Sequence, residues 1–193
     1  MDLRKRRSQE KLQLALARHL QKQTIDEITI GELTRSAGVS RQTFYSNFDS
    51  KQSILLNRIE VVFKKSRNRF DVMLVSSDID REELIQFGLR CLLEECNQDK
   101  ILMRAAFTGQ AGIQCLALLK AKLAKLISDR MLQQFNFDID RTTLDDISNF
   151  YAGAIIGVIQ GWLINETSDK ELSSIVSNTT KLILNGLDSF IKR

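Results

Sequence analysis

The chain has 193 residues, of which 43% are hydrophobic and 27% are charged, with no proline and a formal net charge of +4. This composition is typical of a globular protein of one or two domains and excludes a disordered chain. No apolar stretch approaches the roughly 20 residues needed to cross a membrane, and the charged N-terminus lacks the apolar core of a signal peptide. We therefore expect a cytoplasmic protein without a membrane partner.

Charge is distributed unevenly along the chain. Residues 1–70 contain 15 Lys and Arg against 7 Asp and Glu, whereas residues 71–193 contain 13 against 17. A basic first third indicates contact with a polyanion, either a nucleic acid or an anionic membrane surface. The cysteines Cys91, Cys96 and Cys115 match neither a zinc pattern nor a disulfide framework. We interpret them as buried thiols, with a redox-sensing pair of Cys91 and Cys96 as the less favoured alternative.

Apolar residues recur with a period near 3.6 in nearly every window, so the chain is predicted to be all-α. Ser8 is expected to cap a first helix that runs to about Gln21. The basic run before it is expected to form an arm that lies along phosphates or in a minor groove. This arm consists of Arg4, Lys5, Arg6 and Arg7.

The next two helices are short and joined by a tight turn. The first follows Thr29 and ends at Gly38, because glycine adopts the left-handed conformation without steric cost. Ser40 is placed to cap the second, which carries Phe44 and Phe48 four residues apart on one apolar face. Two helices joined in this way predict a helix-turn-helix, whose second helix enters the major groove of DNA.

With Phe44 and Phe48 turned inward, the opposite face of the second helix is polar and faces outward. Arginine can bind guanine in bidentate fashion and glutamine can do so with adenine. A two-helix corner with a glycine turn is common in helical proteins, but the basic arm and first third favour DNA over a membrane. The predicted DNA-contacting residues are Thr29, Ser40, Arg41, Gln42, Thr43, Tyr45, Ser46, Asn47 and Lys51, together with the arm residues Arg4, Lys5, Arg6 and Arg7.

A linking helix over residues 50–75 leads into a larger helical bundle. Breaks are expected at 77–80, 97–99, 108–112 and 136–140. Helices are expected near 81–95, 142–165 and 168–191, and a long helix is expected to run from the third break to about residue 134. The predicted domains are therefore an N-terminal three-helix DNA-binding domain (1–50) and a C-terminal domain for dimerisation and ligand binding (51–193).

Two features of the second domain point to partners. Gly153, Gly157 and Gly161 recur every four residues on one helix face, which suggests close packing against another helix, favoured to be that of a second subunit. A mainly apolar effector is expected between residues 81 and 165. The candidate pocket residues are Cys91, Met103, Phe107, Cys115, Phe150 and Trp162.

The string from Thr29 to Lys51 closely resembles the N-terminal domain of the TetR family of bacterial regulators. The shared pattern is a Thr before the first of the two short helices, Ala-Gly-Val-Ser at the turn, Thr-x-Tyr in the helix that follows the turn, and then Phe-x-x-Lys. The resemblance implies an all-α homodimer on double-stranded operator DNA. It also implies that Thr29, Ser40, Thr43, Tyr45 and Lys51 hold phosphates, while Arg41, Gln42 and Ser46 address bases. Asn47 stands where family members often carry an aromatic residue or His. The segment from Tyr151 to Trp162 resembles a branch that includes dihydroxyacetone-kinase activators.

An enzyme is not expected. The single histidine, His19, falls beside the buried stripe of the first helix, and we find no P-loop, dinucleotide-binding glycine motif or metal-ligand cluster. Neither a cofactor nor a metal is therefore predicted. The sequence favours a repressor released by a small-molecule or partner signal. The alternatives are an activator that responds to a partner protein and an interaction adaptor that does not bind DNA.

Overall fold

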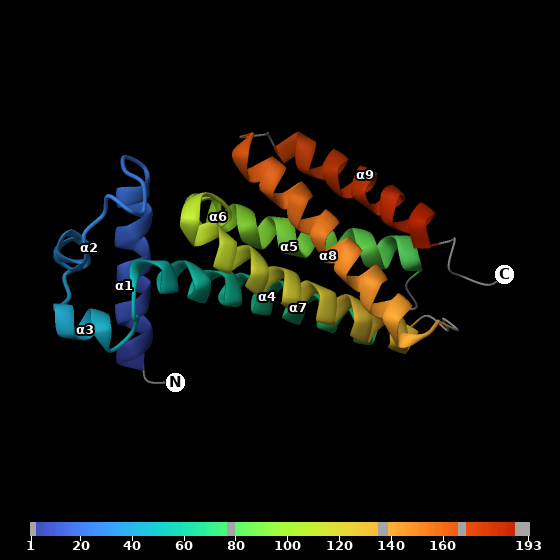
Figure 1. Ribbon diagram of the computed structural model, residues 1–193, viewed down its shortest axis with the longest axis horizontal. Helices are drawn as coiled ribbons and strands as arrows, with labels where there is room; N and C mark the ends of the chain where they lie inside the picture. Colours follow the sequence, from blue (N-terminus) through green and yellow to red (C-terminus); the bar gives the residue numbers. More distant parts are fainter. Residues whose placement is uncertain (1–2, 77–79, 135–138, 166–168, 188–193) are drawn as a thin grey trace. The chain divides into compact units, whose positions relative to one another are not determined.

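The computed structural model describes residues 3–76, 80–134, 139–165 and 169–187, and every element within these ranges is an α-helix (Figure 1). The all-α prediction is therefore confirmed. The helices are α1 (Leu3–Leu20), α2 (Ile30–Ala37), α3 (Arg41–Tyr45), α4 (Lys51–Ser76), α5 (Arg81–Gln98), α6 (Lys100–Phe107), α7 (Gly109–Gln134), α8 (Arg141–Ile164) and α9 (Asp169–Leu187). Most of the predicted break at 136–140 lies outside the described residues.

The chain divides into two compact units. Unit 1 comprises Met1–Val61 and Asp99–Cys115, and unit 2 comprises Val62–Gln98 and Leu116–Arg193. Both α4 and α7 contribute residues to each unit, whereas α6 belongs to unit 1 although it lies far along the chain. The domain boundary after residue 50 stays a prediction.

Unit 1 is built on α1, which contacts α2, α3 and α6. Leu12, Leu16 and Leu33 are fully buried between these helices. Burial of each such side chain contributes about 1.5–3 kcal/mol, so this small core supplies much of the unit's stability. The buried Gln13 donates from Nε2 to Asn57 Oδ1 at 3.0 Å, which ties α1 to the first turns of α4.

Helix α1 begins earlier than predicted. Its first residue is Leu3, and Ser8 lies in the second turn, where its hydroxyl donates to the Arg4 carbonyl at 3.0 Å. The prediction that Ser8 caps this helix is therefore wrong. The prediction of a separate arm over residues 4–7 is also wrong, because Arg4, Lys5, Arg6 and Arg7 are helical. Lys and Arg are good helix formers, and nothing in this run ends a helix.

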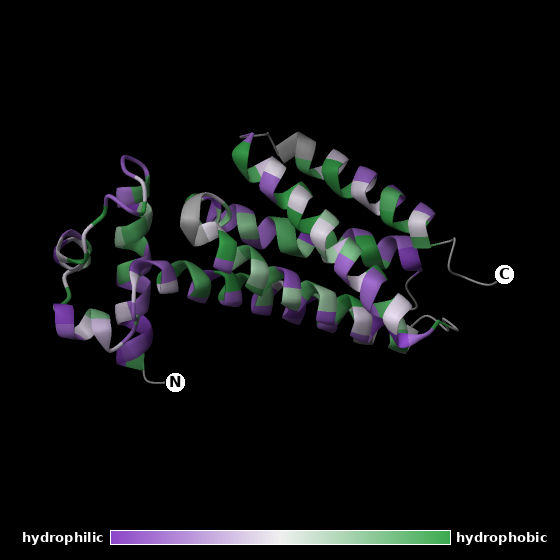
Figure 2. Cartoon of the chain, in the orientation of Figure 1, coloured by the Kyte–Doolittle hydropathy of each residue, from purple (hydrophilic) through white to green (hydrophobic). Residues whose placement is uncertain are grey.

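Unit 2 contains α5, α8 and α9 with the remaining parts of α4 and α7. Both α5 and α8 contact α9. Their hydrophobic stretches lie between the helices, and hydrophilic residues are more frequent on the outside (Figure 2). Buried Ile159 and Trp162 carry the core along α8, and Val176 and Ile183 extend it along α9.

Contrary to the sequence-based expectation, α8 is long and apolar enough to cross a membrane, judged by its length and composition. The bent pair Lys100–Phe107 and Gly112–Leu132 passes the same test when it is taken as one span. Half of the α8 window is buried inside the structure. A core helix of a bundle has this same composition, and α8 lies in the core of unit 2.

Candidate DNA-binding surface and effector cavity

Helix α2 is held at both ends by its own sequence. The Thr29 hydroxyl accepts from the Glu32 backbone N–H at 3.2 Å, and the Glu32 carboxylate accepts from the Thr29 N–H at 2.9 Å and from its hydroxyl at 2.6 Å. This reciprocal capping box fixes the first turn, and the bonds from Thr29 lower the pKa of Glu32. At the other end Gly38 adopts φ 63° and ψ 39°, the left-handed conformation predicted for it.

Helix α3 starts directly after this turn. The Ser40 side chain accepts from the Thr43 backbone N–H at 3.0 Å, so Ser40 is the predicted N-cap. The Ser40 and Thr43 hydroxyls also lie 2.9 Å apart in a hydrogen bond. Phe44 and Phe48 are buried as predicted. Burial of these two rings turns the opposite side of α3 outward.

The outward face of α3 and the turn after it is polar. Arg41, Gln42, Tyr45 and Ser46 are exposed, and Thr43 and Asn47 are half-buried. The Arg41 guanidinium lies against α2, because a Cβ at Gly31 would come within 3.0 Å of Arg41 Nη2. The predicted base-contacting residues Arg41, Gln42 and Ser46 are thus all exposed, the first two at the start of α3 and the third directly after its end.

Lys51, at the start of α4, makes contacts that the sequence did not reveal. Its ammonium donates to the carbonyl oxygens of Ile25, Asp26 and Ile28 at 2.7, 3.2 and 2.5 Å. An ammonium has three N–H donors, so all three are taken by the loop between α1 and α2. Contact between Lys51 and a phosphate stays a prediction, and the structure adds an anchoring role for this side chain.

The basic residues of the first turns of α1 are all exposed. Arg6 Nε lies 3.0 Å from Glu10 Oε1, one helical turn further along. Because both side chains are more than half exposed, this pair contributes little to stability. The basic charge predicted for an arm is therefore carried by a helix, and its contact with DNA stays a prediction.

The capped helix pair, the left-handed turn and the outward polar face form a helix-turn-helix, a motif whose second helix enters the major groove in DNA-binding proteins. Residues 14–57 match the model of the family described as bacterial regulatory proteins, tetR family. This match lies on the segment for which the sequence resemblance predicted a TetR-family DNA-binding domain.

Individual relatives agree with this placement. The chain is 31% identical over 88 residues to the HTH-type transcriptional regulator EthR of Mycolicibacterium smegmatis, a match covering 46% of this chain and 41% of that relative. Solved structures match almost end to end. A TetR-family regulator from Syntrophomonas wolfei has a TM-score of 0.75 at 18% identity, covering 94% of this chain and 96% of that chain. The dihydroxyacetone kinase operon activator DhaS has a TM-score of 0.68 at 18% identity, covering 96% and 98%. At such identities these two show the fold alone.

Unit 2 contains an apolar cavity of about 150 Å³. Its wall comes from α4, α5, α7, α8 and α9, and includes Phe63, Phe70, Leu89, Leu123, Tyr151 and Ile183. The spacing of Phe63, Arg67 and Phe70 places three lining residues on one face of α4, a periodicity that the sequence contained. Which other helices would meet that face could not be read from the pattern.

None of the six predicted pocket residues lines this cavity. Met103, Phe107 and Cys115 are buried in unit 1, and Cys91 and Trp162 are buried in unit 2. For Phe150 an interior position is wrong, because its side chain is 69% exposed. The next residue, Tyr151, takes the inward position, and one step along a helix turns a side chain by about 100°.

The three cysteines are free and buried, as predicted. Burial raises the pKa of Cys96 to about 12 and that of Cys115 to about 11, and it also raises the pKa of Cys91. The thiolate is the reactive form of cysteine. These shifts oppose thiolate formation near neutral pH and so disfavour the redox-sensing alternative.

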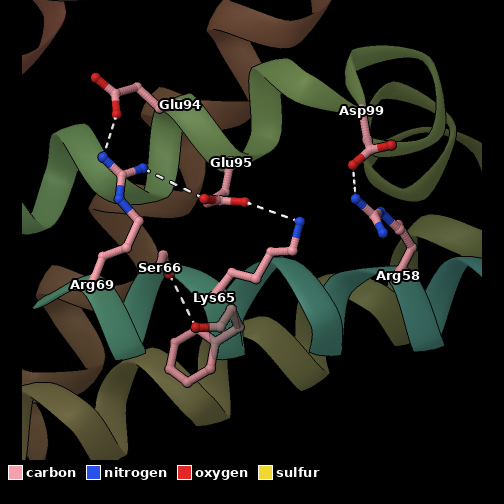
Figure 3. Close-up of polar contacts among 8 residues, drawn as sticks. Arg58, Lys65, Ser66, Arg69, Glu94, Glu95 and Asp99 are labelled. Carbon is pink, nitrogen blue, oxygen red and sulfur yellow. Dashed lines mark hydrogen bonds and ion pairs between the residues drawn. The ribbon is translucent and has the colours of Figure 1, made fainter. Parts of the chain in front are cut away.

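An ion-pair cluster joins α4 to α5 in unit 2 (Figure 3). Arg69 contacts Glu94 at 2.7 Å and Glu95 at 3.5 Å, and Lys65 Nζ lies 3.8 Å from Glu95 Oε2. The hydrogen bond to Glu94 holds the pKa of Arg69 above its ordinary value. The Glu95 side chain is almost fully buried and lies within ion-pair distance of both Lys65 and Arg69. In unit 1, Arg58 pairs with Asp99, the residue before α6.

Proposed function

We propose that this protein is a sequence-specific DNA-binding transcription regulator. It acts in the bacterial cytoplasm as a repressor and leaves its operator when a small molecule occupies the unit 2 cavity. The observation that carries the proposal is the outward polar face of α3, held by capped helices within a matched TetR-family domain. A regulator of this kind needs no catalytic group, and we propose no enzymatic activity.

Base recognition is assigned to Arg41, Gln42 and Ser46, and phosphate contacts to the residues around them. The first two are exposed next to each other in the first turn of α3. The side-chain donors of Arg41 and Gln42 can reach base edges without rearrangement of the core, because the buried Phe44 fixes the opposite side of α3. Thr29, Ser40, Thr43 and Tyr45 border this surface. The Tyr45 hydroxyl and whichever of the Ser40 and Thr43 hydroxyls accepts from the other can donate to phosphate oxygens, whereas the Thr29 hydroxyl, which donates to Glu32, would have to turn toward the DNA.

Replacement of Gln42 by alanine is expected to weaken binding to the preferred operator by about 1–3 kcal/mol and to relax preference at one base position. Bound sequences are selected from a pool of random duplexes, and the affinity of the protein for each selected duplex is then measured by titration. Tyr45→Phe is the matched control, because loss of a phosphate contact weakens all sequences alike. An unchanged sequence preference for Gln42→Ala would show that this side chain does not read a base.

A homodimer is proposed to form through the outer faces of α8 and α9. Phe150 on α8 is 69% exposed and Leu182 on α9 is 72% exposed. On the same α8 face a Cβ at Gly153, Gly157 or Gly161 would meet nothing within 4 Å, so these glycines are not required by packing inside the subunit. A dimer would place two α3 helices about 34–36 Å apart, one turn of DNA.

Gly157→Lys is expected to convert the dimer to a folded monomer, because a charged side chain would be buried in the interface without a partner. Light scattering gives the mass, and circular dichroism reports the retained helix. Asp145→Lys is the control, since it is exposed on α8 about 120° around the helix from Gly157. A Gly157→Lys protein that remains dimeric would place the interface elsewhere.

Activation is the second candidate, because the structurally similar DhaS is named an operon activator. Repression and activation can be distinguished in a transcription assay with the protein's own promoter, purified polymerase and no other factor. Added protein should lower transcript yield from that promoter if it represses. A rise in yield would establish activation and leave the DNA-binding assignment intact.

A further inference from the structure

We propose that the unit 2 cavity binds an amphipathic carboxylate, with its apolar tail inside and its carboxylate on the guanidinium groups of Arg67 and Arg130. The inference rests on the proposed effector role of this cavity and names the chemical class of the effector. It starts from the unequal placement of polar groups around an otherwise apolar wall.

The wall accepts a short hydrocarbon tail. Most of the lining side chains are Leu, Ile or Phe, and the cavity has a volume of about 150 Å³. An apolar cavity of this kind stays dry and takes up apolar groups. A polar group buried against such a wall without a hydrogen bond costs several kcal/mol, on the order of 2–7. The ligand's polar end must therefore lie where the protein offers hydrogen-bond donors.

Two of the polar lining groups already donate to the protein. The Ser66 hydroxyl donates to the Phe63 carbonyl at 3.0 Å, and the Tyr151 hydroxyl donates to the Ile183 carbonyl at 3.1 Å. A Cβ at Gly186 would collide with that tyrosine oxygen, so the glycine keeps the hydroxyl in place. Neither hydroxyl proton is directed to a ligand.

The charged lining residues of the described chain are both arginines, and both contact the same carboxylate. Arg67 Nε lies 3.5 Å from Asp71 Oδ2, and Arg130 Nη2 pairs with Asp71 Oδ1. A guanidinium has five N–H donors, and Asp71 engages only the Nε side of Arg67. This end of the cavity thus offers Arg67 donors that lie away from Asp71, beside a second guanidinium, and suits a carboxylate.

The position of this cationic end is fixed by packing. The Arg130 guanidinium lies over the Phe70 ring, 5.6 Å from its centroid. A Cβ at Gly88 on α5 would come within 3.1 Å of that ring, so glycine allows the ring to lie against the helix. Arg67 is about half exposed, so the carboxylate site is at the solvent-facing end and the tail points inward.

Calorimetry on the full chain with three probes of equal tail length tests the proposal. The probes are octanoate, octan-1-ol and octylammonium. We expect octanoate to bind about tenfold or more tightly than octanol, as one charge-assisted hydrogen bond would give. Octylammonium should bind most weakly, because the guanidinium groups repel it.

Two variants should shift octanoate affinity in opposite directions. Arg67→Gln removes a cation and should weaken octanoate binding about tenfold. Asp71→Asn removes the competing carboxylate and should strengthen it severalfold. Octanol affinity should stay constant in both, which shows that the cavity is intact. Arg90→Gln, exposed on α5 and outside the cavity lining, is the matched control and should change neither affinity.

Operator binding measured on the same samples separates the two hypotheses. A protein that binds DNA but takes octanol as well as octanoate, or neither probe, overturns the carboxylate inference and leaves the DNA-binding function standing. Retained octanoate affinity in Arg67→Gln also overturns it. A protein that binds octanoate with the expected variant pattern but no genomic DNA overturns the proposed function alone.

Discussion

Replacement of Phe44 by alanine is expected to lower the free energy of unfolding by about 3–5 kcal/mol and to abolish DNA binding. The Phe44 side chain has 0% exposure and is among the largest fully buried side chains of the described chain. The centroid of its ring lies 5.3 Å from that of the Tyr45 ring and 6.4 Å from that of the Phe48 ring. Because α3 has only five residues, it cannot keep its position without this anchor.

Urea denaturation followed by circular dichroism measures the loss, and a gel-shift titration measures binding. Phe44→Leu is the matched variant, since it retains most of the apolar volume and should lose clearly less stability. If Phe44→Ala unfolds at the same urea concentration as the parent protein, the ring does not hold α3 as the structure indicates.

Lys51→Met should be the second most damaging change, with a loss of about 2–4 kcal/mol in the free energy of unfolding. A hydrogen bond to a charged group contributes about 1.5–3 kcal/mol, and this ammonium donates to three carbonyls of the α1–α2 loop. The carbonyls of Ile25 and Ile28 belong to buried residues, so methionine leaves them poorly satisfied. Thermal and urea unfolding of the purified variant give the loss.

The same variant tests whether Lys51 also holds a phosphate. Each phosphate contact contributes roughly 0.9 to the slope of log affinity against log salt. A slope that falls by about one in Lys51→Met indicates a phosphate contact in addition to anchoring, and an unchanged slope indicates anchoring alone. Arg18→Met, exposed near the end of α1, is the control for loss of one positive charge. Unchanged stability would contradict the anchoring role.

The sequence predicted the helix-turn-helix well because its signals are local. Thr29 and Ser40 cap the helices that follow them, and Gly38 ends α2, each through contacts within three or four residues. The start of α1 was misplaced because Ser8 has capping chemistry, whereas the preceding basic residues are themselves good helix formers. A cap residue indicates a helix start only where the chain before it resists helix formation.

The cavity was not predictable in the same way. Its wall is assembled from five helices, and hydrophobic periodicity shows which face of each is buried but not which faces meet. Large apolar residues such as Phe107 and Trp162 were plausible lining, yet they fill the cores of their units instead. The two arginines that line the cavity, Arg67 and Arg130, lie 63 residues apart in the sequence and come together only through the fold.

The membership of α6 in unit 1 has a consequence for synthesis on the ribosome. Helix α1 contacts α6, so unit 1 is completed only when Asp99–Cys115 joins Met1–Val61. At about 5–20 residues per second, the intervening translation takes roughly 3–10 s. During that interval the side of α1 that will meet α6 lacks its partner, and a nascent chain halted before residue 99 should be more sensitive to protease than one halted well beyond residue 115.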